Sequence, residues 1–255
     1  MPAETKLFRC LKDNYGVLVH DPASGATAAI DAPEAAPIEA ALKAAGWKLS
    51  DILVTHHHAD HTGGIAELKN KYNCRVVAPK AEAQKIPLVD ETVSEGDKVS
   101  VGRLSANVIE TPGHTAGHIT YWFHGDKLAF AGDTLFSIGC GRVIEGTPEM
   151  MWASLKKLRD LPGETRVYCG HEYTLANIKF AETVEPGNAA LKARAEQAAK
   201  QIAAGQWTIP TTVDEEKAAN PFLRADVPAV AAAVGLAGKP AAEVFAEIRA
   251  RKNKF

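Results

Sequence analysis

Residues 55–64 read Thr-His-His-His-Ala-Asp-His-Thr-Gly-Gly and directly follow the apolar run Ile-Leu-Val. Four histidines and one aspartate therefore stand within six residues, at the end of an expected buried strand. Imidazole and carboxylate together suit borderline divalent metals such as zinc, iron or manganese. Side chains alternate along an extended strand end, so we expect His56 and His58 to point the same way. Asp60 and His61 follow as the chain turns, and the spacing His-x-His-x-Asp-His therefore predicts ligands for two ions.

Three later segments supply the same residue types. A second histidine turn, Thr-Pro-Gly-His-Thr-Ala-Gly-His, begins at Thr111 and contains His114. Asp133 follows one apolar strand pattern and His171 follows another. Each of these motifs is weak by itself, because a single histidine after a strand is more often part of a turn. The four motifs in this order are a strong signal for a dinuclear site, in which a carboxylate is a natural bridging ligand.

The four motifs resemble those of the metallo-β-lactamase fold superfamily. The long form of the first motif is most similar to the glyoxalase II (hydroxyacylglutathione hydrolase) branch. Other segments along nearly the whole chain also look like that family: Asp13-Asn14-Tyr15, Gly139-Cys140-Gly141-Arg142, Glu145-Gly146-Thr147, Gly170-His171-Glu172-Tyr173-Thr174, Asn220-Pro221-Phe222 and the basic C-terminal tail. The metal motif indicates only the superfamily, whereas the C-terminal features carry the family assignment.

The resemblance implies two divalent ions per chain, with zinc as the first expectation and iron or manganese also compatible with these ligands. The implied ligands are His56, His58 and His114 for one ion and Asp60, His61 and His171 for the other, with Asp133 bridging both. Two cations that share one water favour its deprotonation and polarise a substrate carbonyl. The expected nucleophile is therefore a metal-bridging hydroxide, with Asp60 and Asp133 as the catalytic carboxylates. We expect His57 and His118 to lie behind the ligands and to brace them by hydrogen bonds.

The basic C-terminal tail has two readings, one structural and one that concerns substrate binding. Taken alone, it reads as a solvated helix end, where cations favour the helix dipole. By resemblance, however, Arg249 and Lys252 hold the glycine carboxylate of glutathione, and their spacing places them on one helix face. Tyr173 and Arg142 match further family residues that contact the same moiety. Many relatives have a tyrosine where this chain has Ile144, which puts one glutathione contact in doubt.

The resemblance implies a thioester hydrolase that releases glutathione and D-lactate from S-D-lactoylglutathione, the second step of methylglyoxal detoxification. One alternative is a glutathione persulfide dioxygenase, which needs only a single iron held by two histidines and an aspartate. Another is a different hydrolase of the same fold, such as a lactonase or a β-lactamase-like enzyme. A ribonuclease is disfavoured by the near-neutral charge and the lack of an aromatic-basic face. A binding protein without catalysis is disfavoured because every expected ligand position is filled.

Periodicity divides the chain into two expected domains, and the fold class is α+β. Residues 1–172 are expected to form a metallo-β-lactamase-like αββα sandwich that is catalytic. Residues 173–255 are expected to form a small helical, substrate-binding domain, because the pattern there changes from period two to 3.6. Short strands are expected at 7–10, 16–20, 26–31, 52–55, 75–78, 99–101, 107–110, 119–123, 127–131 and 165–169, the last strand of the chain. Helices are expected at 37–45, 65–72, 147–160, 175–184, 189–204, 226–234 and 241–252.

Composition excludes several classes of protein. The 255 residues are 46% hydrophobic and 24% charged, with a net charge of −2, which is ordinary for a globular protein and gives no sign of a nucleic-acid partner. No apolar run reaches the roughly 20 residues that span a bilayer, and no secretory signal is visible at the start. The four cysteines are scattered and fit a reducing compartment. We therefore expect a cytoplasmic protein. We also expect it to be a monomer.

Overall fold

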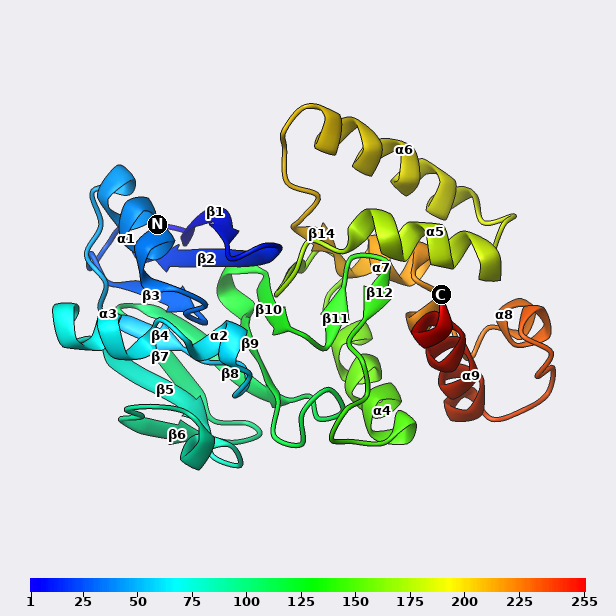
Figure 1. Cartoon of the computed structure of the whole chain (residues 1–255), viewed down its shortest axis with the longest axis horizontal. Helices are drawn as coiled ribbons and strands as arrows, with labels where there is room; N and C mark the ends of the chain where they lie inside the picture. Colours follow the sequence, from blue (N-terminus) through cyan, green and yellow to red (C-terminus); the bar gives the residue numbers. More distant parts are fainter. The chain divides into compact units, whose positions relative to one another are not determined.

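The computed structural model describes residues 1–255, which form two compact units. The first unit contains residues 1–110 and 115–132, and the second contains residues 111–114 and 133–255. In Figure 1 the first unit runs from blue to green and the second from green to red. The expected domain boundary near residue 173 stays a prediction, because it concerns a division by function and periodicity rather than by packing.

The first unit is built from strands and three α-helices. Its elements are β1 (Glu4–Cys10), β2 (Asn14–His20), β3 (Thr27–Ile30), α1 (Ala35–Ala45), β4 (Asp51–Leu53), α2 (Ala59–Thr62), α3 (Ile65–Tyr72), β5 (Arg75–Pro79), η1 (Ala83–Lys85), β6 (Glu91–Val93), β7 (Lys98–Val101), β8 (Leu104–Glu110), β9 (Ile119–Phe123), η2 (His124–Asp126) and β10 (Leu128–Gly132). Strands β1 to β6 form one sheet in chain order, antiparallel from β1 to β3 and parallel from β3 to β6. Strands β10, β9, β8 and β7 lie side by side in an antiparallel arrangement.

Both faces of the β1–β6 sheet are covered. Helices α1 and α3 pack on one face, where Leu42 and Leu68 join a continuous apolar core with Ile52 of β4. Every residue of β2 is buried, so its opposite face is also shielded from water. On that side the hydroxyl of Tyr121, in β9, donates a hydrogen bond to the carbonyl of Val54 at 3.0 Å. The first unit therefore stacks helices, a sheet and a second set of strands, and the histidine segment leaves the sheet between these layers.

The second unit is mostly helical. Its elements are β11 (Leu135–Phe136), β12 (Gly139–Cys140), α4 (Pro148–Arg159), β13 (Arg166–Cys169), α5 (Thr174–Val184), α6 (Ala189–Ala203), β14 (Thr211–Thr212), α7 (Val213–Ala219), η3 (Pro221–Leu223), α8 (Pro228–Ala233) and α9 (Ala241–Lys254). Strands β11 and β12 form a two-stranded hairpin, and β13 pairs with β14. Helix α9 contacts α4, η3 and α8, which fixes the basic tail to this unit (Figure 1). No helix of the protein has both the length and the apolar content that crossing a membrane requires.

Local sequence signals explain several helix ends. Gly46 adopts the left-handed conformation, with φ of 72°, and ends α1 as expected from its freedom at positive φ. Thr147 accepts a hydrogen bond from the amide of Met150, and proline occupies the first turn of α4. The helix expected at 65–72 and the strand expected at 119–123 have those bounds. Most other expected elements differ by a few residues at their ends, as local patterns fix type better than boundary.

Three expectations about elements were wrong. The strand expected at 52–55 ends at Leu53, because the Thr55 amide donates to the Asp31 carboxylate instead of to a neighbouring strand. The strand at 166–169 is not the last one, since β14 follows it. Helix α7 and the β11–β12 hairpin were not expected at all. Elements of two residues carry no periodicity, and α7 is only seven residues long.

Candidate metal centre

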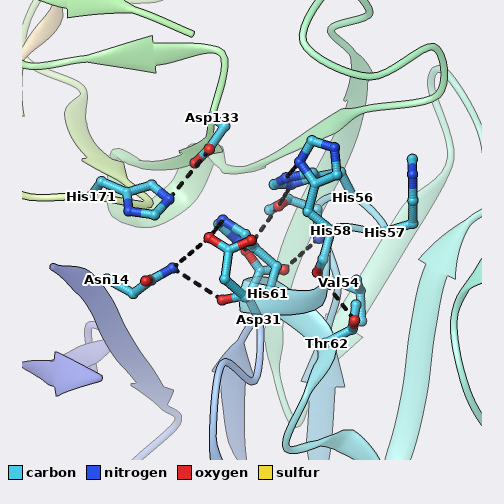
Figure 2. Close-up of polar contacts among 12 residues, drawn as sticks. Asn14, Asp31, Val54, His56, His57, His58, His61, Thr62, Asp133 and His171 are labelled. Carbon is cyan, nitrogen blue, oxygen red and sulfur yellow. Dashed lines mark hydrogen bonds and ion pairs between the residues drawn. The ribbon is translucent and has the colours of Figure 1, made fainter. Parts of the chain in front are cut away.

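The histidine segment of the first unit brings ring nitrogens together. After β4 the chain passes through Thr55, whose carbonyl accepts a hydrogen bond from the Ile119 amide at 3.0 Å, and then enters the short helix α2. His56 is fully buried and its Nε2 lies 3.1 Å from Nδ1 of His58 (Figure 2). Asp60 and His61 are on α2, with Oδ2 of the aspartate 3.6 Å from Nε2 of the histidine. The four predicted ligands of this unit therefore occupy one loop and one helical turn.

Asp31 fixes which nitrogens of these histidines carry lone pairs. Its carboxylate accepts hydrogen bonds from the Thr55 amide at 2.7 Å, from the Thr55 hydroxyl at 2.8 Å and from Nδ1 of His61 at 2.7 Å. The His61 proton is thus on Nδ1, which leaves Nε2 available to a cation. Because the Thr55 hydroxyl proton goes to Asp31, its oxygen accepts from Nδ1 of His56 at 3.0 Å. Asp31 lies near both histidines, but its three donors make it an orienting group rather than a ligand.

Asn14 performs a similar task for Asp60. Its side-chain amide donates to Oδ2 of Asp60 at 3.1 Å and to the Asp60 carbonyl at 3.0 Å. Asn14 is buried at the start of β2, so one strand of the sheet restrains the aspartate. In the sequence, Asn14 stands out only as part of a family motif, and nothing marks Asp31 as part of the site. Their roles depend on long-range contacts that no local pattern reveals.

His57 points away from the ring nitrogens of His56 and His58 (Figure 2). Its backbone amide and its Nδ1 each lie 2.8 Å from Oε2 of Glu82, whose other oxygen accepts from the Gly117 amide at 2.8 Å. Glu82 is 2% exposed, and it ties the first histidine segment to the end of the second histidine turn. Sequence reasoning missed this glutamate, which lies in a stretch without motif character.

His118 packs behind the histidine segment. Its ring centroid lies 4.9 Å from that of His56. A Cβ at Gly132, which has φ of 47°, would lie 2.6 Å from Nε2 of His118 and 2.6 Å from the Thr55 hydroxyl oxygen. Only glycine fits where β10 ends, because both the backbone conformation and the close approach exclude a side chain.

The second unit gathers the other three predicted ligands. Oδ2 of Asp133 lies 3.4 Å from Nε2 of His171 (Figure 2). The same oxygen lies 3.5 Å from Nε2 of His114, and all three side chains are buried. Nδ1 of His114 donates to the carbonyl of Arg142 at 2.9 Å, so the lone pair is on Nε2, the nitrogen that faces Asp133. The ring of His171 stacks on Tyr173 at a centroid distance of 4.8 Å.

These separations fit metal coordination within each unit. Two ligand atoms on one tetrahedral ion with bonds of roughly 2.1 Å are about 3.4 Å apart. The pairs within the first unit lie at 3.1 and 3.6 Å, and those around Asp133 at 3.4 and 3.5 Å. Imidazole nitrogens held as lone-pair donors, beside carboxylates, form the donor set of zinc, iron or manganese. The residues present therefore fit divalent metal ions.

The thiols near these motifs are not metal donors in this arrangement. Burial raises the pKa of Cys140 to about 11 and that of Cys169 to about 12. Neither thiol belongs to a group of donor atoms that lie close enough together to hold one ion. The two cysteines act as packing residues.

A cavity of about 740 Å³ lies in the second unit. Its wall contains His114 and Asp133, and all four predicted substrate-binding residues also line it: Arg142, Tyr173, Arg249 and Lys252. Lys179 and Asn253 line it as well, and sequence reasoning did not select them. Ile144 is 58% exposed and is not part of the wall.

Two cations of α9 are fixed at the wall of this cavity. Nη1 of Arg249 donates to the Cys140 carbonyl at 2.9 Å, and the guanidinium stands 5.2 Å from the ring centroid of Phe222. Nζ of Lys252 donates to the Ala176 carbonyl at 2.9 Å. Burial, followed by the neighbouring Arg249 charge, lowers the pKa of Lys252. Like charges held close together in a partly buried wall favour an anionic ligand.

Comparisons with known proteins agree with this arrangement. The metallo-beta-lactamase superfamily matches residues 11–171, and the family described as hydroxyacylglutathione hydrolase C-terminus matches residues 172–255. The chain is 66% identical over 253 residues to a hydroxyacylglutathione hydrolase of Rhodopseudomonas palustris (strain BisB5), covering 99% of both chains. It is 59% identical over 254 residues to one of Bradyrhizobium sp. (strain ORS 278), covering 100% of both.

Solved structures share the fold. ETHE1 from Myxococcus xanthus aligns with a TM-score of 0.70 and 27% identity, over 99% of this chain and 92% of that one. TTHA1623, solved in a di-iron-bound form, aligns with a TM-score of 0.58 and 27% identity, over 66% of this chain and 92% of that one. The expected fold class, an α+β sandwich of the metallo-β-lactamase type followed by helices, is confirmed.

Proposed function

The chain belongs to the hydroxyacylglutathione hydrolase family of the metallo-β-lactamase superfamily, and from this premise we propose that it hydrolyses S-D-lactoylglutathione to glutathione and D-lactate. Members of this family act on a small glutathione thioester and are thioester hydrolases. The observation that carries the proposal is the cavity whose wall contains two of the candidate metal ligands, His114 and Asp133, and the paired cations Arg249 and Lys252. A cavity of this kind can hold the anionic end of a substrate at the two cations. The other end of the same substrate then faces the metal ligands.

We assign the glutathione moiety to the α9 side of this cavity. Arg249 is 7% exposed, and two acceptors hold its orientation, the Cys140 carbonyl and Oδ1 of Asn253, which accepts from Nε at 3.1 Å. Its remaining donors are therefore presented in a fixed direction. A carboxylate that pairs with Arg249 and Lys252 would offset the repulsion between the two cations. We assign Tyr173 and Arg142 to the same glutathione moiety. Tyr173 stacks on the ring of His171, and Arg142 lies in the same cavity wall.

The metal ligands are proposed as the resemblance implies, with His56, His58 and His114 for one ion, Asp60, His61 and His171 for the other, and Asp133 between them. Two divalent ions so bound would generate a nucleophile from water at neutral pH and polarise the thioester carbonyl. The protein's own contribution is orientation. Asp31 holds His61 and, through Thr55, His56, while Asn14 holds Asp60.

The leaving group needs little assistance from the protein. A thiol has an ordinary pKa near 8.5, so the glutathione thiolate departs without a strong general acid. No acid with this task is required among the residues of the cavity wall. We propose that Asp60 orients the attacking water through the carboxylate that Asn14 fixes. An Asp60→Asn variant that retained both metals and full turnover would contradict this role.

We further propose zinc as the ion at both positions, with iron or manganese as alternatives, because imidazole and carboxylate ligands accept all three. A monomer is proposed because the substrate cavity is lined by residues of one unit of a single chain. A cytoplasmic location is proposed because all four cysteines are free thiols, as in a reducing compartment.

The test is a spectrophotometric assay of S-D-lactoylglutathione with the metal-loaded protein. Arg249→Ala should raise KM, and Arg251→Ala is the matched control. Arg251 stands on the same helix, but it pairs with Glu247 and does not line the cavity. Rapid thioester loss with a KM effect confined to Arg249 supports the proposal. Absence of turnover by protein carrying both metals refutes it.

The two remaining candidates are separated in the same experiment. A lactone or β-lactam substrate tests for another hydrolase of this fold, which would not need the α9 cations. Oxygen consumption with glutathione persulfide tests for a dioxygenase, which needs one iron only. The second set of candidate ligands, Asp60, His61 and His171, favours the hydrolase over the dioxygenase.

A further inference from the structure

The turn of the β11–β12 hairpin holds a strained residue. Ile138 has φ of 56° and is fully buried. Left-handed backbone is rare for a β-branched residue and strained, so it persists only where surrounding groups impose it. Neighbouring Ser137 is also buried, at 3% exposure. The hairpin is therefore held in this conformation by its surroundings rather than by its own preference.

Two fully buried side chains impose that conformation. Oε2 of Glu216, on α7, accepts a hydrogen bond from the Ile138 amide at 2.9 Å. The side-chain amide of Asn220 donates to the Gly139 carbonyl at 3.0 Å, to the Phe136 carbonyl at 3.3 Å and to Glu216 at 2.8 Å. Backbone groups on both sides of the strained residue are thus bound by one carboxyl–amide pair.

Two further polar side chains hold Ser137. The side-chain amide of Asn177, on α5, donates to its carbonyl at 3.1 Å, and Nη2 of Arg194, on α6, donates to its hydroxyl at 3.1 Å. Buried polar and charged groups are expensive unless their partners are well placed. A hairpin that needed only to be covered would be served better by apolar side chains. The free-energy cost of burying these polar and charged groups points to a requirement for a defined hairpin geometry.

The hairpin leads directly into the wall of the substrate cavity. The Cys140 carbonyl, at its end, is the acceptor that fixes Nη1 of Arg249 at 2.9 Å. The Gly141 amide donates to the Thr134 carbonyl at 3.2 Å, and a Cβ at Gly141 would lie 1.9 Å from the Asp133 carbonyl oxygen. A shift of the hairpin would therefore move both the cation that is to bind substrate and the backbone beside a candidate metal ligand.

We propose that Glu216 and Asn220 are positioning residues for the substrate cavity: they hold the strained hairpin so that the Cys140 carbonyl aims the Arg249 guanidinium at the substrate carboxylate. The geometric part concerns the hairpin alone. The kinetic part rests on the proposed function, because it assigns the carboxylate of a glutathione thioester to Arg249.

The geometric part is tested by pulse labelling of the free cysteines with an alkylating reagent and by mass spectrometry of each site. Cys140 lies in the hairpin, whereas Cys10 and Cys74 are buried in the other unit. Glu216→Ala and Asn220→Ser should label Cys140 about tenfold faster than wild type and leave Cys10 and Cys74 unchanged. Asn220→Ser is the milder change, because serine can still cap the Phe222 amide that Asn220 now caps.

Two controls accompany these variants. Glu216→Gln keeps an acceptor for the Ile138 amide and should label Cys140 like wild type. Thr212→Ala removes the N-cap of α7 without touching the hairpin, and should also leave Cys140 protected. Unchanged labelling of Cys140 in both Glu216→Ala and Asn220→Ser overturns the proposal. Faster labelling of all cysteines together also overturns it, since the pair would then serve stability in general.

The kinetic part uses S-D-lactoylglutathione and the same variants. In Glu216→Ala and Asn220→Ser the Arg249 guanidinium should no longer point at the substrate carboxylate, which weakens one charge-assisted hydrogen bond. KM should therefore rise about tenfold, with kcat changed by less than about threefold. Glu216→Gln should retain the wild-type KM. A fall in kcat at unchanged KM contradicts the assignment to substrate positioning. If the wild-type protein itself does not hydrolyse the thioester, the proposed function fails, while the labelling result still decides whether the pair holds the hairpin.

Discussion

Glu216 should make the stability of this protein depend on pH in a window where ordinary carboxyl groups do not titrate. The side chain is fully buried, and burial raises its pKa from the ordinary 4.5 to about 7. Hydrogen bonds from the Ile138 amide, Asn220 and Thr211, and the charge of Arg194, oppose this rise without cancelling it. The carboxyl group is therefore partly protonated near neutral pH in the folded protein.

The direction in which stability changes with pH follows from the number of protons that the folded and the unfolded protein bind. Between pH 4.5 and 7 the folded protein keeps a proton on Glu216 that the unfolded chain has lost, so the free energy of unfolding falls as pH rises. The contribution is complete below pH 4.5 and is lost by pH 7. At about 1.4 kcal/mol for each pKa unit, the rise in pKa corresponds to about 3 kcal/mol. Gln cannot titrate and resembles the protonated acid, so Glu216→Gln should exceed wild type in the free energy of unfolding by about 1 kcal/mol at pH 5 and by about 3 kcal/mol at pH 8.

The assay is urea unfolding of wild type and Glu216→Gln at both pH values, with the same metal concentration throughout. Every other ionisable group is the same in both proteins, so its contribution cancels in the comparison. A Glu215→Gln variant is the control, because Glu215 stands beside Glu216 in the exposed capping box of α7. An equal pH dependence of unfolding in wild type and Glu216→Gln would refute the reasoning.

Three further predictions follow from single contacts. Asp31→Asn should weaken metal binding about 10- to 100-fold, since His61 loses its charged acceptor; competition with a chromophoric chelator measures this, and an unchanged affinity would argue against the orienting role. Gly141→Ala should lower kcat/KM about 100-fold, because its Cβ would lie 1.9 Å from the Asp133 carbonyl oxygen, whereas Gly187→Ala meets nothing within 4 Å and should be neutral in the same assay. Tyr121→Phe should lower the free energy of unfolding by about 1–2 kcal/mol in urea, through loss of its bond to the Val54 carbonyl, while metal content stays constant; a stability equal to wild type would mean that the hydroxyl contributes nothing.

Four of the candidate ligands, His56, His58, Asp60 and His61, could be selected from the sequence because they stand within six positions of one another. A strand that ends in His-x-His-x-Asp-His carries both the residue types and their spacing in six positions. Helix ends are local too, as at Gly46 and Thr147, where a single residue satisfies backbone groups of its own turn. The cations of α9 were selected through resemblance, since a basic helix end has an ordinary reading as well.

The groups that orient the ligands were beyond sequence reasoning. Asp31 and Glu82 are single acidic residues without a motif around them. Asp31 binds His61 and Thr55, and Glu82 binds His57 and Gly117. Contacts across 24 to 35 positions of the chain leave no periodic trace, so only the folded arrangement assigns them a role.

The amino-acid sequence by itself determined the donor types, their spacing and the family of this chain, because those properties depend on neighbouring residues. The tertiary structure alone decided which nitrogen of His56, His61 and His114 carries a lone pair. It also decided how a buried carboxyl and amide hold a strained hairpin, and which cations share a cavity wall. Those properties depend on hydrogen bonds and desolvation, which arise only when distant segments pack together and exclude water.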